Sequence, residues 1–347
     1  MFTFISYFCL FFFIISSFSD RISPLAFPYI SYFGLFFPFV FCLNILFFLF
    51  CFALKKWKQM FVTLIIFLIC WEAIYTYFPI HKKIKKIPEK CIHVLTYNIM
   101  HFGNSNEYLE VNHNPIIQYI VDQNPDIICL QEFKSKNQAQ LSAIRNALRS
   151  TPYYFILPCG VALFSKYDIL SAKKVPLESV SNGALIAELN INGEKVTILN
   201  CHLESNKISD SEKIEYFNLI KAPNIYKLKS FMYVMFSKLT PAFKMRAIQS
   251  IIISEIIKKN KNRYVIVCGD FNDTPISYTY HKIKGDLNDA FVENGCGMGI
   301  SFDSNHFLFR IDYILHSNNM RSYNIMVGKL KDSDHYPVQT YLRFIHN

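Results

Sequence analysis

The chain has 347 residues, 52% of them hydrophobic, and a formal net charge of +10. This length and composition exclude a single small fold and leave room for one large domain with a second region beside it. The basic excess is compatible with an anionic substrate or an anionic membrane surface, although a solvated basic face is the commoner cause. None of the 10 cysteines stands in a CxxC pair, which argues against a structural zinc site.

The first 80 residues carry very few charges. Three apolar stretches lie between those charges, at residues 2–19, 22–54 and 59–80. A helix needs about 20 apolar residues to cross the hydrocarbon layer of a bilayer. The sequence therefore predicts a region of three transmembrane helices, the second of them within residues 32–54. The first stretch lacks the basic start and the small-residue cleavage site of a signal peptide, so we expect it to be retained.

The charges around these stretches bear on the orientation of the chain. Three crossings would place Lys55, Lys56 and Lys58 on one side of the membrane and the large domain on the other. Arginine and lysine residues occur on both sides, and their count slightly favours a cytoplasmic domain. The difference is too small to assign the side that the domain faces.

After a basic linker at residues 81–90, the remaining residues, 91–347, have the pattern of a folded domain. Strand-like and helix-like stretches alternate at its start, which predicts α/β layering. Asn192 and Gly193 join two alternating stretches, a strong signal for a hairpin. Strands are expected over residues 91–98, 126–132, 161–165, 169–172, 184–190, 195–201, 264–268, 309–315, 324–327 and 337–344, and helices over residues 114–121, 137–148, 241–259 and 277–283.

Polar side chains recur where the predicted strands end. Asp270 and Asn272 stand two residues apart after a buried strand, so in an extended segment both point to the same side. A carboxylate can take a proton from water, and an amide can donate to an anionic oxygen. The same residues are also ordinary turn formers. In layered α/β folds sites form where strand ends meet, and the other polar strand ends are Asn98, Glu132, His202, Asp312, Asp334 and His335.

Six short motifs follow one another between residues 92 and 344: LTYNIM, LQE, NCHLES, CGDFNDTP, RIDYIL and SDHYPV. In this order they resemble the endonuclease/exonuclease/phosphatase superfamily, which includes pancreatic deoxyribonuclease, neutral sphingomyelinases and inositol polyphosphate 5-phosphatases. More narrowly, the chain is similar to membrane-anchored bacterial members, which implies a bacterial inner-membrane protein. The resemblance implies an α/β (α+β) four-layer sandwich, with two packed mixed β-sheets flanked by helices and preceded by the three transmembrane helices.

The resemblance also implies a metal site. Glu132 would be the principal ligand of a divalent ion, Mg²⁺ or Mn²⁺, with Asn98 and Asp334 near it. The residue types agree independently, because hard carboxylate and amide oxygens without a thiolate pair suit these ions better than zinc.

Catalytic roles follow from the same resemblance. Asp270 would orient or deprotonate the attacking water, and Asn272 would hold a phosphoryl oxygen. His335, oriented by Asp312, and His202 would stabilise developing charge or serve the leaving oxygen.

Two hypotheses about function follow. The first is a membrane-tethered, metal-dependent phosphoesterase that acts on a phosphodiester or phosphomonoester in nucleic acid, phospholipid or a small molecule. The second is a membrane-anchored binding protein without chemistry on the same fold. Met100 and His202 differ from the residues that apurinic-site nucleases carry at these places, which points away from that branch. The bilayer is an expected partner, and no protein partner can be inferred.

Residues 227–239, KLKSFMYVMFSKL, form a distinctive segment in a long insertion after His202. Its mixture of lysines with aromatic and aliphatic side chains is typical of segments at a membrane interface. We predict that it lies beside the mouth of the site and touches the membrane surface. The alternative is that its aromatic side chains cover the flank of the sandwich.

Overall fold

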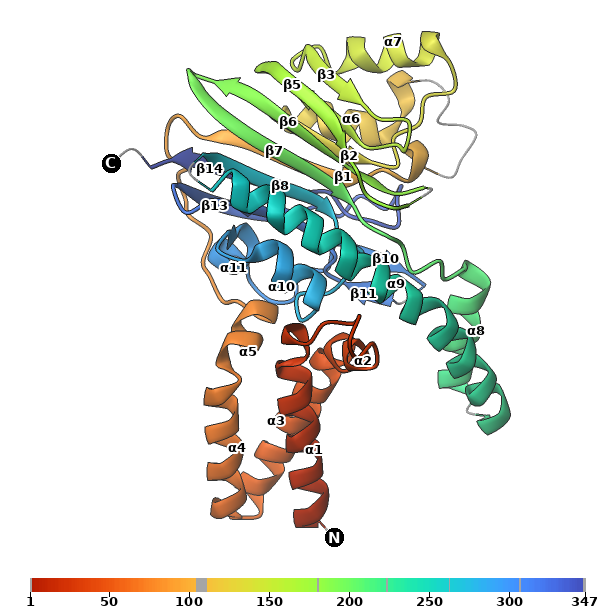
Figure 1. Cartoon of the computed structure of the whole chain (residues 1–347). Coiled ribbons are helices and arrows are strands. Elements are labelled where there is room, and N and C mark those ends of the chain that lie inside the picture. Colours follow the sequence, from red (N-terminus) through yellow and green to blue (C-terminus); the bar gives the residue numbers. More distant parts are fainter. Residues whose placement is uncertain are drawn as a thin grey trace.

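The computed structural model describes residues 2–103, 111–179, 181–222, 224–261, 263–305 and 307–345. The chain forms a two-sheet sandwich and an N-terminal helical bundle that projects from one side of it (Figure 1). The sandwich holds the strand ends that the sequence singles out, and the bundle contains the apolar stretches.

Each large sheet of the sandwich has six strands. The strand order is β13-β14-β1-β2-β4-β3 in the first sheet and β5-β6-β7-β8-β12-β9 in the second. The pairs β1–β2 and β7–β8 are parallel and the other neighbours are antiparallel, so both sheets are mixed. The strands of the first sheet are β1 (Ile92–Asn98), β2 (Ile127–Gln131), β3 (Tyr153–Ile156), β4 (Ala162–Ser165), β13 (Met320–Val327) and β14 (Val338–Phe344). Those of the second are β5 (Asp168–Val175), β6 (Gly183–Ile191), β7 (Glu194–His202), β8 (Tyr264–Asp270), β9 (Asn288–Asp289) and β12 (Asp312–His316), and β10 (Phe302–Ser304) pairs with β11 (Phe307–Phe309) in a small separate sheet.

Three apolar clusters explain the layering. Side chains such as Val94 and Ile198 meet between the two sheets. The outer face of the first sheet is covered by side chains such as Ile116, and that of the second by side chains such as Ile253. The central strands are thus buried on both faces, which accounts for their continuous apolar runs. The helices of the sandwich are α6 (Pro115–Gln123), α7 (Gln138–Ala147), α8 (Asp210–Lys221), α9 (Ile225–Lys259), α10 (Tyr278–Lys284) and α11 (Ala290–Asn294), with short 3₁₀ turns η2 (Met100–Phe102) and η4 (Val111–His113). Two mixed sheets flanked by helices confirm that part of the predicted fold.

The long insertion differs from the prediction. A helix was expected to begin at Pro241, but α9 is one helix of 35 residues with Pro241 inside it. A proline in a helix interior costs about 3 kcal/mol or more. Burial of Phe231, Met235 and Phe243 on both sides of the proline offsets that cost. Helix α8 and strands β3, β10 and β11 were also not expected.

The N-terminal region is broken into shorter helices than the sequence predicts. They are α1 (Phe2–Ser17), η1 (Ser19–Arg21), α2 (Ile30–Leu35), α3 (Phe37–Ala53), α4 (Trp57–Ile69) and α5 (Trp71–Tyr77). Among the described residues, only Thr3–Arg21 is long and apolar enough to cross a membrane. The pair α4 and α5 passes the same test only together, across a bend of 69°. The predicted count of three transmembrane helices is therefore wrong, because composition does not reveal where an apolar stretch bends.

The bundle is docked firmly on the sandwich. Ile276, in the loop that follows β8, is buried in one apolar cluster with Phe13, Phe37 and Tyr77 of the bundle. The Arg310 guanidinium donates a hydrogen bond to the backbone carbonyl of Thr76 (2.5 Å). The bundle therefore contacts the segments that lead out of β8 and into β12.

Gly269 in β8 provides a test of close strand packing. Its φ is +124°, and a Cβ there would lie 1.9 Å from the Cys201 carbonyl oxygen of β7. Gly193 in the hairpin turn also has a positive φ, +92°, but no atom of the described residues lies within 4 Å of the place that its Cβ would take. Gly193→Ala should cost only backbone strain, about 1–3 kcal/mol. Gly269→Ala should cost about 3 kcal/mol more or prevent folding, because it adds a backbone clash. Chemical denaturation of both variants measures the difference, and equal losses would contradict the packing shown here.

Candidate active site

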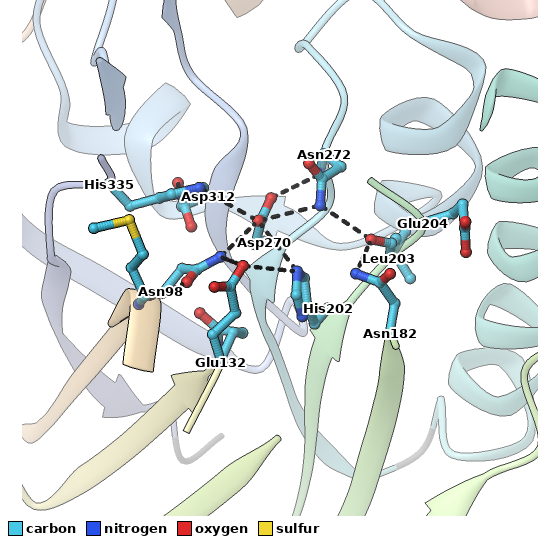
Figure 2. Close-up of polar contacts among 12 residues, drawn as sticks. Asn98, Glu132, Asn182, His202, Leu203, Glu204, Asp270, Asn272, Asp312 and His335 are labelled. Atoms are coloured by element: carbon cyan, nitrogen blue, oxygen red, sulfur yellow. Dashed lines mark hydrogen bonds and ion pairs between the residues drawn. The ribbon is translucent and has the colours of Figure 1, made fainter. Parts of the chain in front are cut away.

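The candidate site lies where the carboxyl ends of two parallel strand pairs meet. Strands β1 and β2 end together at one edge of the first sheet, and β7 and β8 end together in the second. Figure 2 shows that side chains from all four strand ends point toward one another. The structure brings together seven of the eight predicted site residues: Asn98, Glu132, His202, Asp270, Asn272, Asp312 and His335.

The Asn98 amide lies at the centre of this cluster. Its Nδ2 donates to Glu132 Oε1 and to Asp270 Oδ2, both at 3.1 Å. Its Oδ1 accepts the backbone N–H of Met100 at 3.2 Å. One buried amide therefore joins the acid of the first sheet to the acid of the second, and both of its ends are held.

Two of the site residues have an unusual backbone. Glu132 directly after β2 and Asn272 after β8 both have φ of +54°, in the left-handed region. This conformation is uncommon for residues other than glycine, and where it persists it often re-aims a functional side chain. The Glu132 side chain is 31% exposed, whereas that of Asp270 is 1% exposed. Solvent and ligands can therefore reach Glu132 directly.

Asp270 is buried among polar partners. Its Oδ1 accepts the backbone N–H of Asn272 at 2.8 Å, and its Oδ2 lies 3.6 Å from His335 Nε2. Burial raises the pKa of Asp270 to about 7, against the opposing effect of His335 and with a further rise from Asp312. A carboxylate whose pKa lies near neutral pH can exchange a proton with water in either direction, as a general base requires.

The two histidines of the site have opposite charge states. His335 Nδ1 lies 2.9 Å from Asp312 Oδ2. Burial lowers the pKa of His335, but the carboxylates of Asp312 and Asp270 outweigh it and raise the pKa to about 10. Burial, together with His335 and His101, lowers the pKa of His202 to about 3. At neutral pH His335 is therefore a cation and His202 is neutral, so the same residue type can fill two different chemical roles.

The predicted metal ligands are only partly assembled. Glu132 and Asn98 are hydrogen-bonded to each other, and their oxygens are of the type that Mg²⁺ and Mn²⁺ prefer. Within the described ranges, no hydrogen bond or ion pair joins the Asp334 side chain to either of them. The neighbouring Ser333 hydroxyl donates to the Asn98 carbonyl at 2.8 Å, which keeps the backbone of this motif beside β1. The partly exposed Glu132 carboxylate fits an oxygen-bound cation.

A second group of possible ligands is less suited to a metal. Asp270, Asp312 and His335 are all buried, and their ligand atoms lie within 4.8 Å of one another. However, His335 Nδ1 already lies 2.9 Å from Asp312 Oδ2, and its Nε2 lies 3.6 Å from Asp270 Oδ2. These three side chains are therefore already partners of one another in a buried acid–base cluster.

Two residues that hold the site in place, Asn182 and Ser301, were missed by sequence reasoning. Asn272 Nδ2 donates to the Leu203 carbonyl at 3.0 Å and to Asp270 Oδ2 at 3.2 Å. Asn272 must exchange one of these partners in order to hold a phosphoryl oxygen. The same Leu203 carbonyl accepts from Asn182 Nδ2 at 3.0 Å (Figure 2). Ser301 Oγ accepts the backbone N–H of Asp312 at 3.0 Å. Asn182 and Ser301 directly precede β6 and β10 and do not follow the carboxyl end of a strand, so no motif drew attention to them.

Known proteins share this architecture. Among solved structures, a protein of the endonuclease/exonuclease/phosphatase family from Bacteroides thetaiotaomicron has a TM-score of 0.51 and 17% identity, over 74% of this chain and 99% of that one. The endonuclease/exonuclease/phosphatase from Beutenbergia cavernae has a TM-score of 0.50 and 15% identity, over 74% and 72%. TDP2 from C. elegans has a TM-score of 0.50 and 18% identity, over 74% and 76%. At these identities the likeness establishes the fold alone.

Sequence models identify the family. A model described as a domain of unknown function matches residues 1–77. No curated protein matches the chain. The model of the Endonuclease/Exonuclease/phosphatase family matches residues 95–335, which is more than half of the chain and contains every residue of the cluster in Figure 2. The protein therefore belongs to the endonuclease/exonuclease/phosphatase family, whose members hydrolyse phosphate esters.

Proposed function

We propose that the protein is a membrane-tethered, divalent-metal-dependent hydrolase of phosphodiesters or phosphomonoesters. One observation carries this proposal. A buried carboxylate with a pKa of about 7 lies between a cationic and a neutral histidine, at 3.6 Å and 3.7 Å, where the two sheets meet. Hydrolysis of a phosphate ester needs a base for water and positive charge for the developing anion, and this arrangement contains both.

Each residue of the cluster has a distinct role in the proposed hydrolysis. Asp270 accepts a proton from the attacking water, because its carboxylate is the buried base of the cluster. His335, held by Asp312, presents a charged N–H that stabilises an anionic oxygen or protonates the leaving oxygen. Neutral His202 and the Asn272 amide are donors to the phosphoryl oxygens. Glu132, with Asn98 beside it, would hold a divalent cation, which would add positive charge beside the phosphate group.

The surface of the bundle supports membrane tethering. Its outward-facing side chains include Phe4, Phe11, Leu46 and Leu68, which are 58% to 75% exposed. Such a continuous apolar surface is rare on a protein surrounded by water. The turn between α3 and α4, which contains Lys55 and Lys56, lies at the end of the bundle away from the sandwich (Figure 1). Arg21 belongs to η1, whose Asp20 pairs with His281 of α10 in the sandwich. An apolar layer between two charged ends is the pattern of a segment inserted in a bilayer.

Removal of the metal or of the base tests the proposed chemistry. Purified full-length protein in detergent should hydrolyse at least one substrate class among DNA, RNA, phospholipid and small phosphoesters. EDTA should abolish this activity, and Mg²⁺ or Mn²⁺ should restore it.

Asp270→Asn should lower kcat by at least about 10²-fold with little change in KM, because proton removal matters in the transition state. The exposed Asp122→Asn, on α6, is the matched control and should keep full activity. Unchanged turnover in EDTA or in Asp270→Asn would reject the mechanism, and a complete lack of hydrolysis would favour a binding protein.

The opposite charge states predict a specific pH profile. Asp270 must be deprotonated to act, so activity should rise as the pH increases through about 7. His335 must be protonated, so activity should fall above about 10. Asp312→Asn removes the carboxylate hydrogen-bonded to His335, so the falling limb should move to lower pH. The exposed Asp286→Asn makes the same change of charge outside the cluster and should leave the limb in place. A falling limb that does not move in Asp312→Asn would show that His335 is not the group responsible.

A further inference from the structure

Helix α8 and the first part of α9, residues 210–221 and 225–239, form a helical hairpin that we call the arm. Leu219, Phe231 and Met235 of the arm are buried in a small apolar cluster, against which Tyr32 and Leu35 of α2 also pack. At its base, Lys238 Nζ donates to Glu212 Oε2 at 2.6 Å and to the Lys207 carbonyl at 2.9 Å. The arm is therefore a packed element of the fold.

The arm also presents an apolar stripe to the outside. Tyr226 and Tyr233 are 80% and 77% exposed, and Ile225, Leu228 and Met232 beside them are exposed as well. Spacings of three, four and seven residues place these side chains on adjoining faces of α9. Lys227 and Lys229 are exposed in the same turns. Phe231 is buried and Phe236 packs on Tyr32, so neither side chain can make the predicted contact with the membrane surface. That contact would be made by the exposed side chains of the stripe.

The arm is attached to the N-terminal bundle. Tyr32 of α2 contacts the rings of Phe236 and Phe243 of α9, with centroids 4.7 Å and 5.3 Å apart. The Tyr32 hydroxyl also lies 2.9 Å from Thr240 Oγ1. Figure 1 shows that the arm and the bundle extend from the same side of the sandwich. A bilayer that contains the bundle would therefore lie on the side toward which the arm points.

The arm is also connected to the site. Arg246 of α9 is completely buried, and its Nη1 donates to the Glu204 carbonyl at 2.8 Å. Its Nε donates to Asp273 Oδ2 at 3.2 Å. Glu204 and Asp273 lie in the loops that follow β7 and β8, just after His202 and Asn272. The helix that carries the exposed stripe thus holds both loops at the edge of the site.

We propose that the exposed stripe of the arm lies on the bilayer surface beside the bundle, and that the site acts on phosphate esters of membrane lipids. The substrate class rests on the proposed function. Tyrosine and lysine are the side chains that settle at headgroup depth, and lysines attract anionic lipids. The loop that follows β8 contacts the bundle through Ile276. One loop at the edge of the site therefore lies against the bundle.

Fluorescence quenching tests the arm's contact with lipid independently of activity. The two native tryptophans are first replaced, as Trp57→Phe and Trp71→Phe. In this background, Tyr233→Trp places a fluorophore on the arm, and Tyr153→Trp places one at an exposed position of β3, on the far part of the sandwich. Full-length protein is reconstituted in vesicles of phosphatidylcholine and phosphatidylglycerol that carry a spin label near the headgroup. The Tyr233→Trp emission should be quenched and the Tyr153→Trp emission should not. Equal quenching, or self-association that shields the arm, would overturn the contact.

Hydrolysis tests the substrate class. Wild-type protein in vesicles should release product both from vesicle phospholipid and from a soluble aryl phosphate ester. The double variant Tyr226→Ser/Tyr233→Ser should lose about tenfold or more on vesicle phospholipid, since two interfacial aromatic anchors are removed, and keep its rate on the soluble ester. Tyr153→Ser/Leu170→Ser, which removes two exposed apolar side chains from β3 and β5, should change neither rate.

The two possible failures can be told apart. Hydrolysis of the soluble ester alone by the wild type would overturn the lipid substrate and leave the proposed function intact. Hydrolysis of neither ester would overturn the proposed function and the substrate class together, whereas the quenching result would still decide whether the arm touches lipid. Equal losses on both esters in the arm variant would show that the tyrosines support folding and would overturn their role at the interface.

Discussion

The hydrogen bonds of the Asn98 amide are the contact on which the rest of the site depends. Elsewhere the two sheets meet mostly through apolar side chains, and a second buried amide, Asn200 of β7, accepts from Gln131 Nε2 and donates to the Leu130 and Ala162 carbonyls of the first sheet. Asn98 connects Glu132 of one sheet with Asp270 of the other, so that a shift of either sheet would break a buried hydrogen bond. Leaving such a group unsatisfied costs about 1–3 kcal/mol. The apolar core and the Asn200 hydrogen bonds hold the two sheets together, and the Asn98 amide joins their two acids directly.

Burial of the aligned side chains changes their pKa values. The same low-polarity environment raises the pKa of Asp270 and lowers that of His202, because each becomes less able to hold its charge. His335 is the exception, since the neighbouring carboxylates of Asp312 and Asp270 compensate for its lost hydration. The site therefore carries a positive charge on His335 at neutral pH, close to Asp270, a base that can lose its proton near that pH. Few residues are needed for this, because the environment distinguishes between identical side chains.

Sequence reasoning succeeds where chemistry and local pattern coincide. The central strands are apolar runs that end in polar residues, so Asn98, Glu132 and Asp270 are recognisable from the order of the residues alone. Sequence reasoning fails where contacts between residues far apart in the chain determine the local structure. Pro241 signals a helix start locally, yet distant packing carries α9 through it. Asn182 acts on a backbone carbonyl from a loop, and nothing in its neighbourhood marks that role. The apolar N-terminal stretches predict membrane affinity but not the bends that divide them.

The docking of the bundle on the sandwich has a mechanical consequence. A Cβ on Gly34 would lie 2.0 Å from the Ile276 carbonyl, so the backbones of the two parts approach as closely as a glycine allows. Residues 81–90 are attached too, through paired hydrogen bonds between Asn324 and Ile84. The sandwich is thus packed directly against the N-terminal helices and is joined to them by more than a flexible linker. In the proposed bilayer, this packing would hold the candidate site at one height and one tilt, so that encounters with a lipid substrate would follow lateral diffusion in two dimensions.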